Sequence, residues 1–157
     1  MTKASLRKMS NNPLLIPSSA PYEAPPFDTV QEEHYLPAIQ EAIEQARRNV
    51  EKIKTNEEKP SFENTIVALE TASDLLGTVT SIFYNQLSAA GTDTLEALAE
   101  KIGPMNANFA NDVALDETLF ARVKTVYDRR EELDLNAEEK TLLEDTYKGF
   151  VRGGALL

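Results

Sequence analysis

The chain has a single histidine, His34, and no cysteine, so few side chains could hold a catalytic metal. A helical zinc site of the His-Glu-x-x-His type needs two histidines four residues apart, which present both imidazole nitrogens to one ion, and its glutamate acts as the base. The neighbouring run Glu32-Glu33-His34 is better explained as a solvated first helical turn in which the histidine packs or caps the backbone. We therefore expect these 157 residues to bind no zinc.

Other catalytic patterns are missing as well. A serine triad would have to use His34, and the chain has no Gly-x-Ser-x-Gly sequence, the turn that exposes a nucleophilic serine. The glycines do not follow the spacing of a phosphate-binding loop. The pairs Glu57-Glu58 and Glu138-Glu139 are interpreted as water-facing charges rather than acid–base groups. The sequence thus predicts no catalytic, cofactor-binding or metal-binding residue.

Composition narrows the classes of partner. A formal net charge of −10 argues against nucleic acid and an anionic membrane surface as partners. Binding to either needs an excess of basic side chains that neutralise phosphate groups, and this chain has none. The absence of cysteine excludes disulfides and thiol nucleophiles. No apolar stretch approaches the roughly 20 residues of a membrane span, and Leu14-Leu15-Ile16 is too short for the core of a signal peptide. We expect a cytoplasmic protein without nucleic-acid or membrane partners.

The expected fold is all-α, a bundle of about five helices. The stretch from Pro60 to Leu87 organises it, because apolar residues recur there every three or four positions over a broad helical face. We predict one long central helix in this stretch. Residues 1–27 are predicted to form a proline-rich irregular leader, packed as an extended strap from about Asn12, and residues 28–157 to form one helical domain.

Local signals refine the helices. Proline is tolerated in a first turn, so Pro37 places the start of the first long helix near Tyr35. Gly103-Pro104 predicts a kink or a break. Gly77 within the central helix is interpreted as a close approach of a neighbouring helix. Helix caps are predicted at three positions: Ser61, Asp116 and Asn136.

The C-terminal residues Ala155-Leu156-Leu157 are apolar and follow the helix stop Gly153-Gly154. Natural C-termini usually carry a polar tail, so we expect the chain to be part of a longer protein. In that case a helix surface has lost its partner, and we predict an exposed apolar patch near residues 143–157.

Nine short stretches stand out by their order and spacing along the chain: Asn12-Pro13-Leu14-Leu15, Ala24-Pro25-Pro26-Phe27-Asp28, His34-Tyr35-Leu36-Pro37-Ala38, Phe62-Glu63-Asn64-Thr65-Ile66, Ala68-Leu69-Glu70, Leu119-Phe120-Ala121-Arg122-Val123, Arg129-Arg130, Phe150-Val151-Arg152 and Gly154-Ala155. Together they resemble one known family, the thimet-oligopeptidase-like zinc peptidases. The similarity runs from about residue 12 to the last residue, and it is strongest to the bacterial peptidyl-dipeptidases of the Dcp type and weaker to oligopeptidase A.

The resemblance implies the N-terminal helical region of a much longer enzyme, whose zinc helix lies far downstream. No catalytic residue can therefore be carried over to this chain. In the family this region supplies one wall of a channel for short peptides, and Dcp-type members remove dipeptides from a free C-terminus. The implied partners are the C-terminal catalytic half of the same chain and short peptides. Two alternatives remain open: a parent endopeptidase of the oligopeptidase A type, and a self-contained acidic helical adaptor that binds a basic partner.

Overall fold

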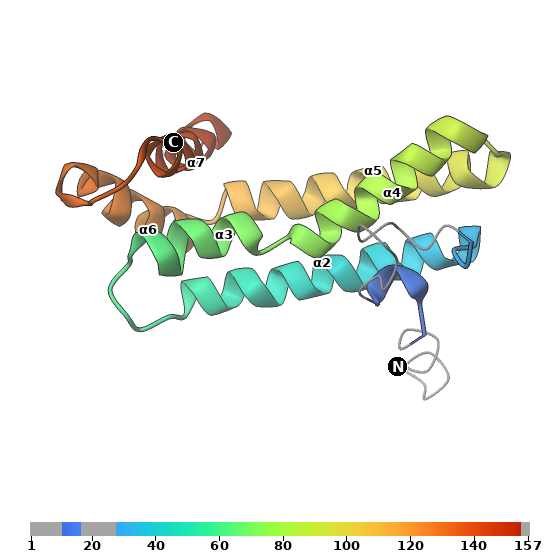
Figure 1. Ribbon diagram of the computed structural model, residues 1–157, viewed down its shortest axis with the longest axis horizontal. Coiled ribbons are helices and arrows are strands. Elements are labelled where there is room, and N and C mark those ends of the chain that lie inside the picture. Colours follow the sequence, from blue (N-terminus) through green and yellow to red (C-terminus); the bar gives the residue numbers. More distant parts are fainter. Residues whose placement is uncertain (1–10, 17–27, 155–157) are drawn as a thin grey trace. The chain divides into compact units, whose positions relative to one another are not determined.

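The computed structural model describes residues 11–16 and 28–154, and every regular element within these ranges is a helix (Figure 1). The fold class is all-α, as predicted, and α2, α4, α5, α6 and α7 correspond to the five expected helices. The elements are η1 (Pro13–Leu15), α2 (Glu32–Lys54), η3 (Phe62–Val67), α3 (Ala68–Thr71), α4 (Asp74–Ala90), α5 (Asp93–Ala114), α6 (Glu117–Asp128), η4 (Arg130–Glu132) and α7 (Ala137–Gly153).

The chain forms two compact units, and two of its helices contribute to both. Of the described residues, unit 1 takes those within Met1–Ala46 and Ser73–Asn106, and unit 2 takes those within Arg47–Ala72 and Ala107–Leu157. Each unit has its own buried apolar side chains. In unit 1 these include Ile39, Phe83 and Ile102, and in unit 2 they include Leu119 and Leu143.

The predicted leader is described only at residues 11–16, where Pro13–Leu15 form a 3-10 turn instead of an extended strap. The Oδ1 of Asn12 accepts a hydrogen bond from the Leu14 N–H at 3.0 Å, and its Nδ2 donates to the His34 carbonyl at 2.9 Å. Leu14 is buried. This short turn is therefore packed against the start of α2. The other leader positions, 1–10 and 17–27 with Phe27, lie outside the described residues.

Helix α2 begins earlier than the sequence predicted. It starts at Glu32, so Pro37 lies inside the helix and not in its first turn. Contacts from outside stabilise that turn: the Gln31 N–H donates to His34 Nδ1 at 2.9 Å, and Asn12 binds the His34 carbonyl. Glu32 and Glu33 also place negative charge at the positive end of the helix dipole.

The predicted central helix is wrong as a single element. It begins with η3, a π-helical turn in which the Ala68 N–H donates to the Glu63 carbonyl five residues back. It is then interrupted between α3 and α4, where Ser73 leaves helical geometry with φ −118° and ψ 22°. The side chain of Asn49 in α2 donates to the Ala72 carbonyl at 3.0 Å and so satisfies the backbone at this break.

One helical stretch, Phe62–Ala90, is long and apolar enough to cross a membrane by length and composition, which corrects the sequence-based statement that no stretch approaches that length. The core helix of a globular protein passes the same test, so the finding is weak evidence for a membrane span. Here the apolar residues Phe62, Ile66, Val79 and Phe83 are buried within the fold. The break at Ser73 also divides the stretch into separate helices.

The sequence predicted a kink or a break at Gly103-Pro104; helix α5 continues through both residues, so the break is absent. The position of a Cβ at Gly103 lies 3.8 Å from the Tyr84 hydroxyl, which is ordinary van der Waals contact within unit 1. The predicted caps are confirmed: Asp116 accepts from the Leu119 N–H, and Ser61 and Asn136 each form a capping box.

The interpretation of Gly77 as a close helix contact is wrong. Gly77 is exposed, and no atom lies within 4 Å of the position that a Cβ would take. Gly153 is the glycine at a close approach, because its Cβ position lies 3.3 Å from the Ala114 Cβ.

Gly77→Ala is therefore expected to raise the free energy of unfolding by about 0.5–1 kcal/mol, since alanine loses less backbone entropy in a helix. Gly149→Ala should give a similar gain, because Gly149 in α7 is equally open. Gly153→Ala is the opposite control and should give no gain. Urea denaturation followed by circular dichroism measures all three. A destabilised Gly77→Ala would contradict the open environment of this site.

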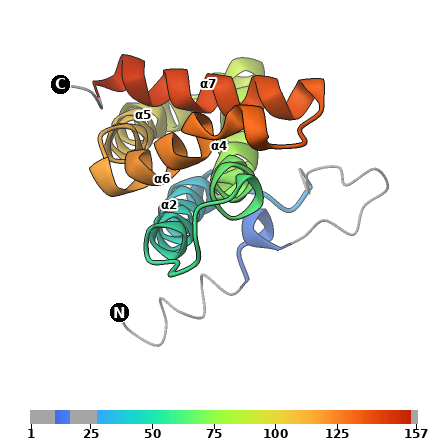
Figure 2. The same ribbon diagram turned by 90° about the vertical axis from the view of Figure 1, so that its left-hand side faces the viewer.

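The predicted apolar patch near residues 143–157 is wrong for the part that the structure describes, residues 143–154. Leu143 and Phe150 are buried there, and none of the exposed large hydrophobic residues lies in this range. Figures 1 and 2 show α7 beside α6, and the Phe120 ring lies 5.8 Å from the rings of both Tyr147 and Phe150. The apolar side of α7 is thus used within unit 2. Residues 155–157 lie outside the described residues.

Candidate functional site

The residues that the sequence singled out for chemistry do not form a cluster. His34 accepts the Gln31 N–H at Nδ1, as expected for a capping histidine, and Glu32 accepts a hydrogen bond from the Thr92 hydroxyl at 2.6 Å. Glu57 and Glu58 are exposed. Glu139 accepts the Asn136 N–H at 2.8 Å and so completes a helix cap.

Zinc is the metal that the family resemblance implies, and the described residues do not fit it. No group of three or more histidine, cysteine, aspartate or glutamate side chains that could hold a metal ion occurs among residues 11–16 and 28–154. Zinc in proteins is held by three or four such ligands. No chemical step is therefore assigned to zinc at any residue of this chain.

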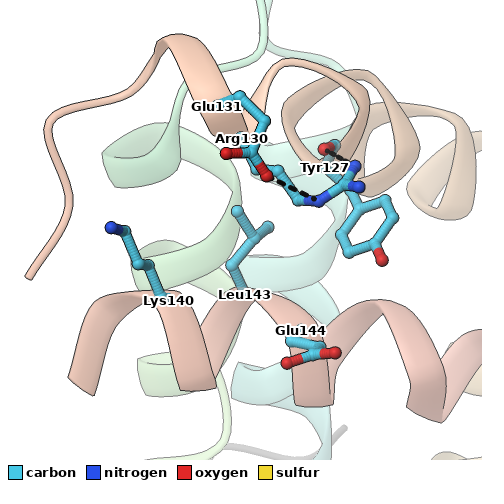
Figure 3. Close-up of a pocket in the computed structure, with 6 residues that line it drawn as sticks. All are labelled: Tyr127, Arg130, Glu131, Lys140, Leu143 and Glu144. Carbon is cyan, nitrogen blue, oxygen red and sulfur yellow. Dashed lines mark hydrogen bonds and ion pairs between the residues drawn. The ribbon is translucent and has the colours of Figure 1, made fainter. Parts of the chain in front are cut away.

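One pocket of about 300 Å³ lies in unit 2 between the end of α6 and α7 (Figure 3). Arg130 lies over the Tyr127 ring at 4.3 Å from its centroid, and this ring stacks on Tyr147 at 3.8 Å with an interplanar angle of 3°. The other lining residues are Glu131, Lys140, Leu143 and Glu144. Cation–π and ring stacking therefore fix one side of this pocket.

Three of the four charged side chains that line this first pocket form ion pairs, one of them with Lys148 outside the lining. Arg130 lies 3.6 Å from a carboxylate oxygen of Glu131, and Glu144 lies 2.8 Å from Lys148. The hydrogen bond from Lys148 lowers the pKa of the Glu144 carboxyl, so that side chain remains an anion. With two carboxylates and two cations in its lining, the pocket has no net preference for an anionic or a cationic ligand.

The sequence did not predict the role of Arg122, which is the buried cation of unit 2 among the described residues. Arg122 as a whole residue is 9% exposed. One terminal nitrogen, Nη1, donates to the Asn56 carbonyl at 2.7 Å, and Nη2 lies 3.4 Å from the Glu58 carbonyl and 3.3 Å from Asn64 Oδ1. Arg122 thus ties the connection after α2 to the π-helical turn. The available signal was its position on the apolar stripe of α6, beside Val123.

A second pocket of unit 2, of about 390 Å³, lies next to this cluster and contains three asparagines. We call it the amide pocket. Asn64 caps η3, with Oδ1 accepting the Ser61 N–H at 2.8 Å, and Asn56 accepts the Glu58 N–H at 2.9 Å. The lining residues are Asn49, Lys52, Ile53, Asn56, Asn64, Ala68, Thr71 and Ala72.

An ion pair joins α2 to the start of α6 in the same unit. Lys54 Nζ lies 2.7 Å from the Asp116 carboxylate, and both side chains are about one-fifth exposed. Burial alone would raise the pKa of Asp116, but hydrogen bonds from Lys54 and the Leu119 N–H outweigh it and lower the pKa below 3.8. The hydrogen bonds to Asp116 and Glu51 raise the pKa of Lys54 above 10.5.

Asp116→Ala is expected to lower the free energy of unfolding at neutral pH by about 1–2 kcal/mol, because the helix cap and the ion pair are lost together. Asp116→Asn keeps the cap and should lose less than about 1 kcal/mol. Because the folded pKa of Asp116 is lowered, its stabilisation is present above pH 3.8 and is lost as the pH falls through the folded pKa. Urea denaturation should therefore show that the difference in free energy of unfolding between wild type and Asp116→Ala shrinks at acid pH. A difference of equal size at every pH would contradict a contribution from the charge of Asp116.

Comparison with known proteins identifies clear relatives, although no protein-family model matches the chain. The chain is 42% identical over 146 residues to a dipeptidyl carboxypeptidase of Escherichia coli (strain K12), which covers 93% of this chain. A dipeptidyl carboxypeptidase of Salmonella typhimurium is 40% identical over 149 residues, and an oligopeptidase A of Escherichia coli is 27% identical over 143 residues.

The chain spans about a fifth of the length of these curated relatives, with 21%, 22% and 20% covered in the three cases. The higher identity to the two dipeptidyl carboxypeptidases agrees with the order of similarity found in the sequence, with oligopeptidase A more distant. The predicted resemblance is confirmed: over most of its length the chain is homologous to part of the dipeptidyl carboxypeptidases.

Proposed function

We propose that this chain is a non-catalytic part of a zinc-dependent peptidyl-dipeptidase that removes dipeptides from the free C-terminus of short peptides. The observation that carries the proposal is the 42% identity to a dipeptidyl carboxypeptidase over 93% of the chain. That name describes the relative, and we extend its activity to this chain only as part of the proposal.

The proposed role of the chain is structural. Its described residues offer helices, pockets and a buried arginine, and they contain no metal-binding group. We propose that the helices form one wall of a channel that admits short unstructured peptides. Zinc and its ligands then belong to the remaining part of the parent protein, which is the main partner of this chain. We propose the cytoplasm as the place of action, with no nucleic-acid or membrane partner.

The direct test is the activity of the intact gene product. Incubation with a short peptide that has a free C-terminus should release dipeptides, detected by mass spectrometry, and a zinc chelator should stop the release. The purified 157-residue chain should release no dipeptide and should hold no stoichiometric zinc by elemental analysis. Dipeptide release by this chain alone, or undiminished activity of the intact protein after chelation, would overturn the proposal.

The weaker similarity to oligopeptidase A supports an endopeptidase as the second candidate. A peptide with a blocked C-terminus separates the two, because a dipeptidase of this kind needs the free carboxylate. Internal cleavage of the blocked peptide would favour the endopeptidase. If the intact protein shows neither activity and binds one basic partner in a salt-sensitive way, the acidic helical adaptor is favoured.

A further inference from the structure

We propose that the amide pocket of unit 2 binds the C-terminal residue of an extended peptide, with Lys52 and Asn56 on its carboxylate and Asn49 on its last backbone N–H. The inference rests on the proposed function, since it assumes peptides as ligands, and it assigns a peptide contact to particular residues. The pocket, of about 390 Å³, is large enough for a small ligand, for which sites of roughly 300–1,000 Å³ are typical.

The charge of the lining favours an anion. The whole chain has 26 acidic and 16 basic residues, yet the lining of this pocket contains Lys52 and no aspartate or glutamate. The Lys52 side chain is exposed and makes no hydrogen bond or ion pair with any described residue. The buried guanidinium of Arg122 contacts two lining residues, through the Asn56 carbonyl and Asn64 Oδ1. Two cations therefore act on a pocket that carries no negative side chain.

The hydrogen-bonding groups left over by the fold match a peptide end. Asn56 uses Oδ1 for the Glu58 N–H, which leaves its amide nitrogen as a donor within the described structure. Asn49 uses Nδ2 for the Ala72 carbonyl, which leaves its Oδ1 as an acceptor there. A carboxylate needs donors and a peptide N–H needs an acceptor, so this set is complementary to a C-terminal residue.

The remaining lining supports the same ligand. Ile53, Ala68 and Ala72 give the pocket an apolar part, which can contact the side chain of the bound residue. Part of the lining comes from the π-helical turn and the helix that follows it, and π-helical turns occur frequently at functional sites. The first pocket offers this chemistry less well, because its lining carries Glu131 and Glu144 and because Arg130 is paired with Glu131.

The test is a titration of the ¹⁵N-labelled 157-residue chain, followed by NMR, with acetyl-tetra-alanine that carries a free C-terminal carboxylate. We expect saturable shifts of the lining residues, among them the side-chain amides of Asn49 and Asn56. The same peptide as a C-terminal amide should bind about tenfold more weakly, because a charge-assisted hydrogen bond is lost. Acetate alone should bind far more weakly than the peptide.

Two lysine variants provide the matched comparison. Lys52→Gln should weaken binding of the free-acid peptide about tenfold, and the backbone spectrum shows whether the fold is kept. Lys59→Gln makes the same change of charge at an exposed lysine outside the lining and should leave the affinity unchanged. No saturable shift at millimolar peptide would overturn the assignment. So would equal binding of acid and amide, equal weakening by both variants, or acetate that binds as well as the peptide.

This experiment and the test of the proposed function can fail separately. Binding is measured on the 157-residue chain without any cleavage, whereas dipeptide release is measured on the intact gene product. Dipeptide release without binding at the amide pocket would support the peptidase proposal and contradict the proposed binding site. Binding without dipeptide release would support the binding site and contradict the peptidase proposal.

Discussion

Phe83→Ala is expected to lower the free energy of unfolding by about 3–5 kcal/mol. The Phe83 ring is fully buried in unit 1, with the Tyr35 ring at 5.2 Å and the Tyr84 ring at 5.1 Å, both in edge-to-face arrangement. Its removal leaves a cavity that the surrounding helices cannot fill without moving, and it also removes two aromatic pairs.

Urea denaturation measures this loss, and hydrogen exchange locates it. Phe83→Leu keeps most of the volume and should lose far less stability. Tyr84→Ala is a control at the next position, because Tyr84 is 38% exposed, and its loss should also be smaller. Faster exchange should be greatest in α4, the helix that carries Phe83. A loss for Phe83→Ala that is no greater than that for Tyr84→Ala would contradict the central place of this ring in unit 1.

The helices and their caps could be predicted because both are local properties of the sequence. The spacing of Ile39, Ile43 and Val50 marks the buried side of α2, and all three are buried as expected. A cap requires one polar side chain and an N–H two or three residues later, as Asp116 and Asn136 provide. Signals of this range need no knowledge of the tertiary structure.

The errors arose where partners distant in the sequence decide the backbone. Asn49 in α2 satisfies the carbonyl at the break after Ala72, and Asn12 supports the early start of α2. Gly77 shows the opposite case, since a glycine in a helix suggests a close contact and the structure has open space there. A single sequence contains no signal for such contacts.

The candidate site was missed for a related reason. Lys52, Asn56 and Asn64 are polar residues at a helix end, in a connection and at a cap, where polar residues are common and indicate no ligand. Their convergence depends on the chain turning back after α2. Arg122 carried the one readable signal, a charge on an apolar stripe, but its partners are backbone carbonyls, which sequence patterns do not reveal.

Arg122→Ala is expected to lower the free energy of unfolding by about 2–4 kcal/mol, the second large effect. The Asn56 carbonyl, the Glu58 carbonyl and Asn64 Oδ1 would lose their common donor, and the space of the buried side chain would be left empty. Arg152→Ala, at an exposed arginine of α7, is the matched control and should cost less than about 0.5 kcal/mol.

Arg122→Met separates the two parts of that loss, because methionine fills much of the volume but donates no hydrogen bond. Replacing a buried charge by an apolar group can be neutral when its partners can rebind water. Here Nε of Arg122 has no partner among the described residues. The desolvation cost of burying the guanidinium is therefore offset only by the hydrogen bonds of its two terminal nitrogens to three acceptors. If these hydrogen bonds determine the conformation of the connection, Arg122→Met should remain destabilised, and the N–H groups of residues 57–59 should exchange faster. Full stability with unchanged exchange would instead assign the role of Arg122 to packing alone.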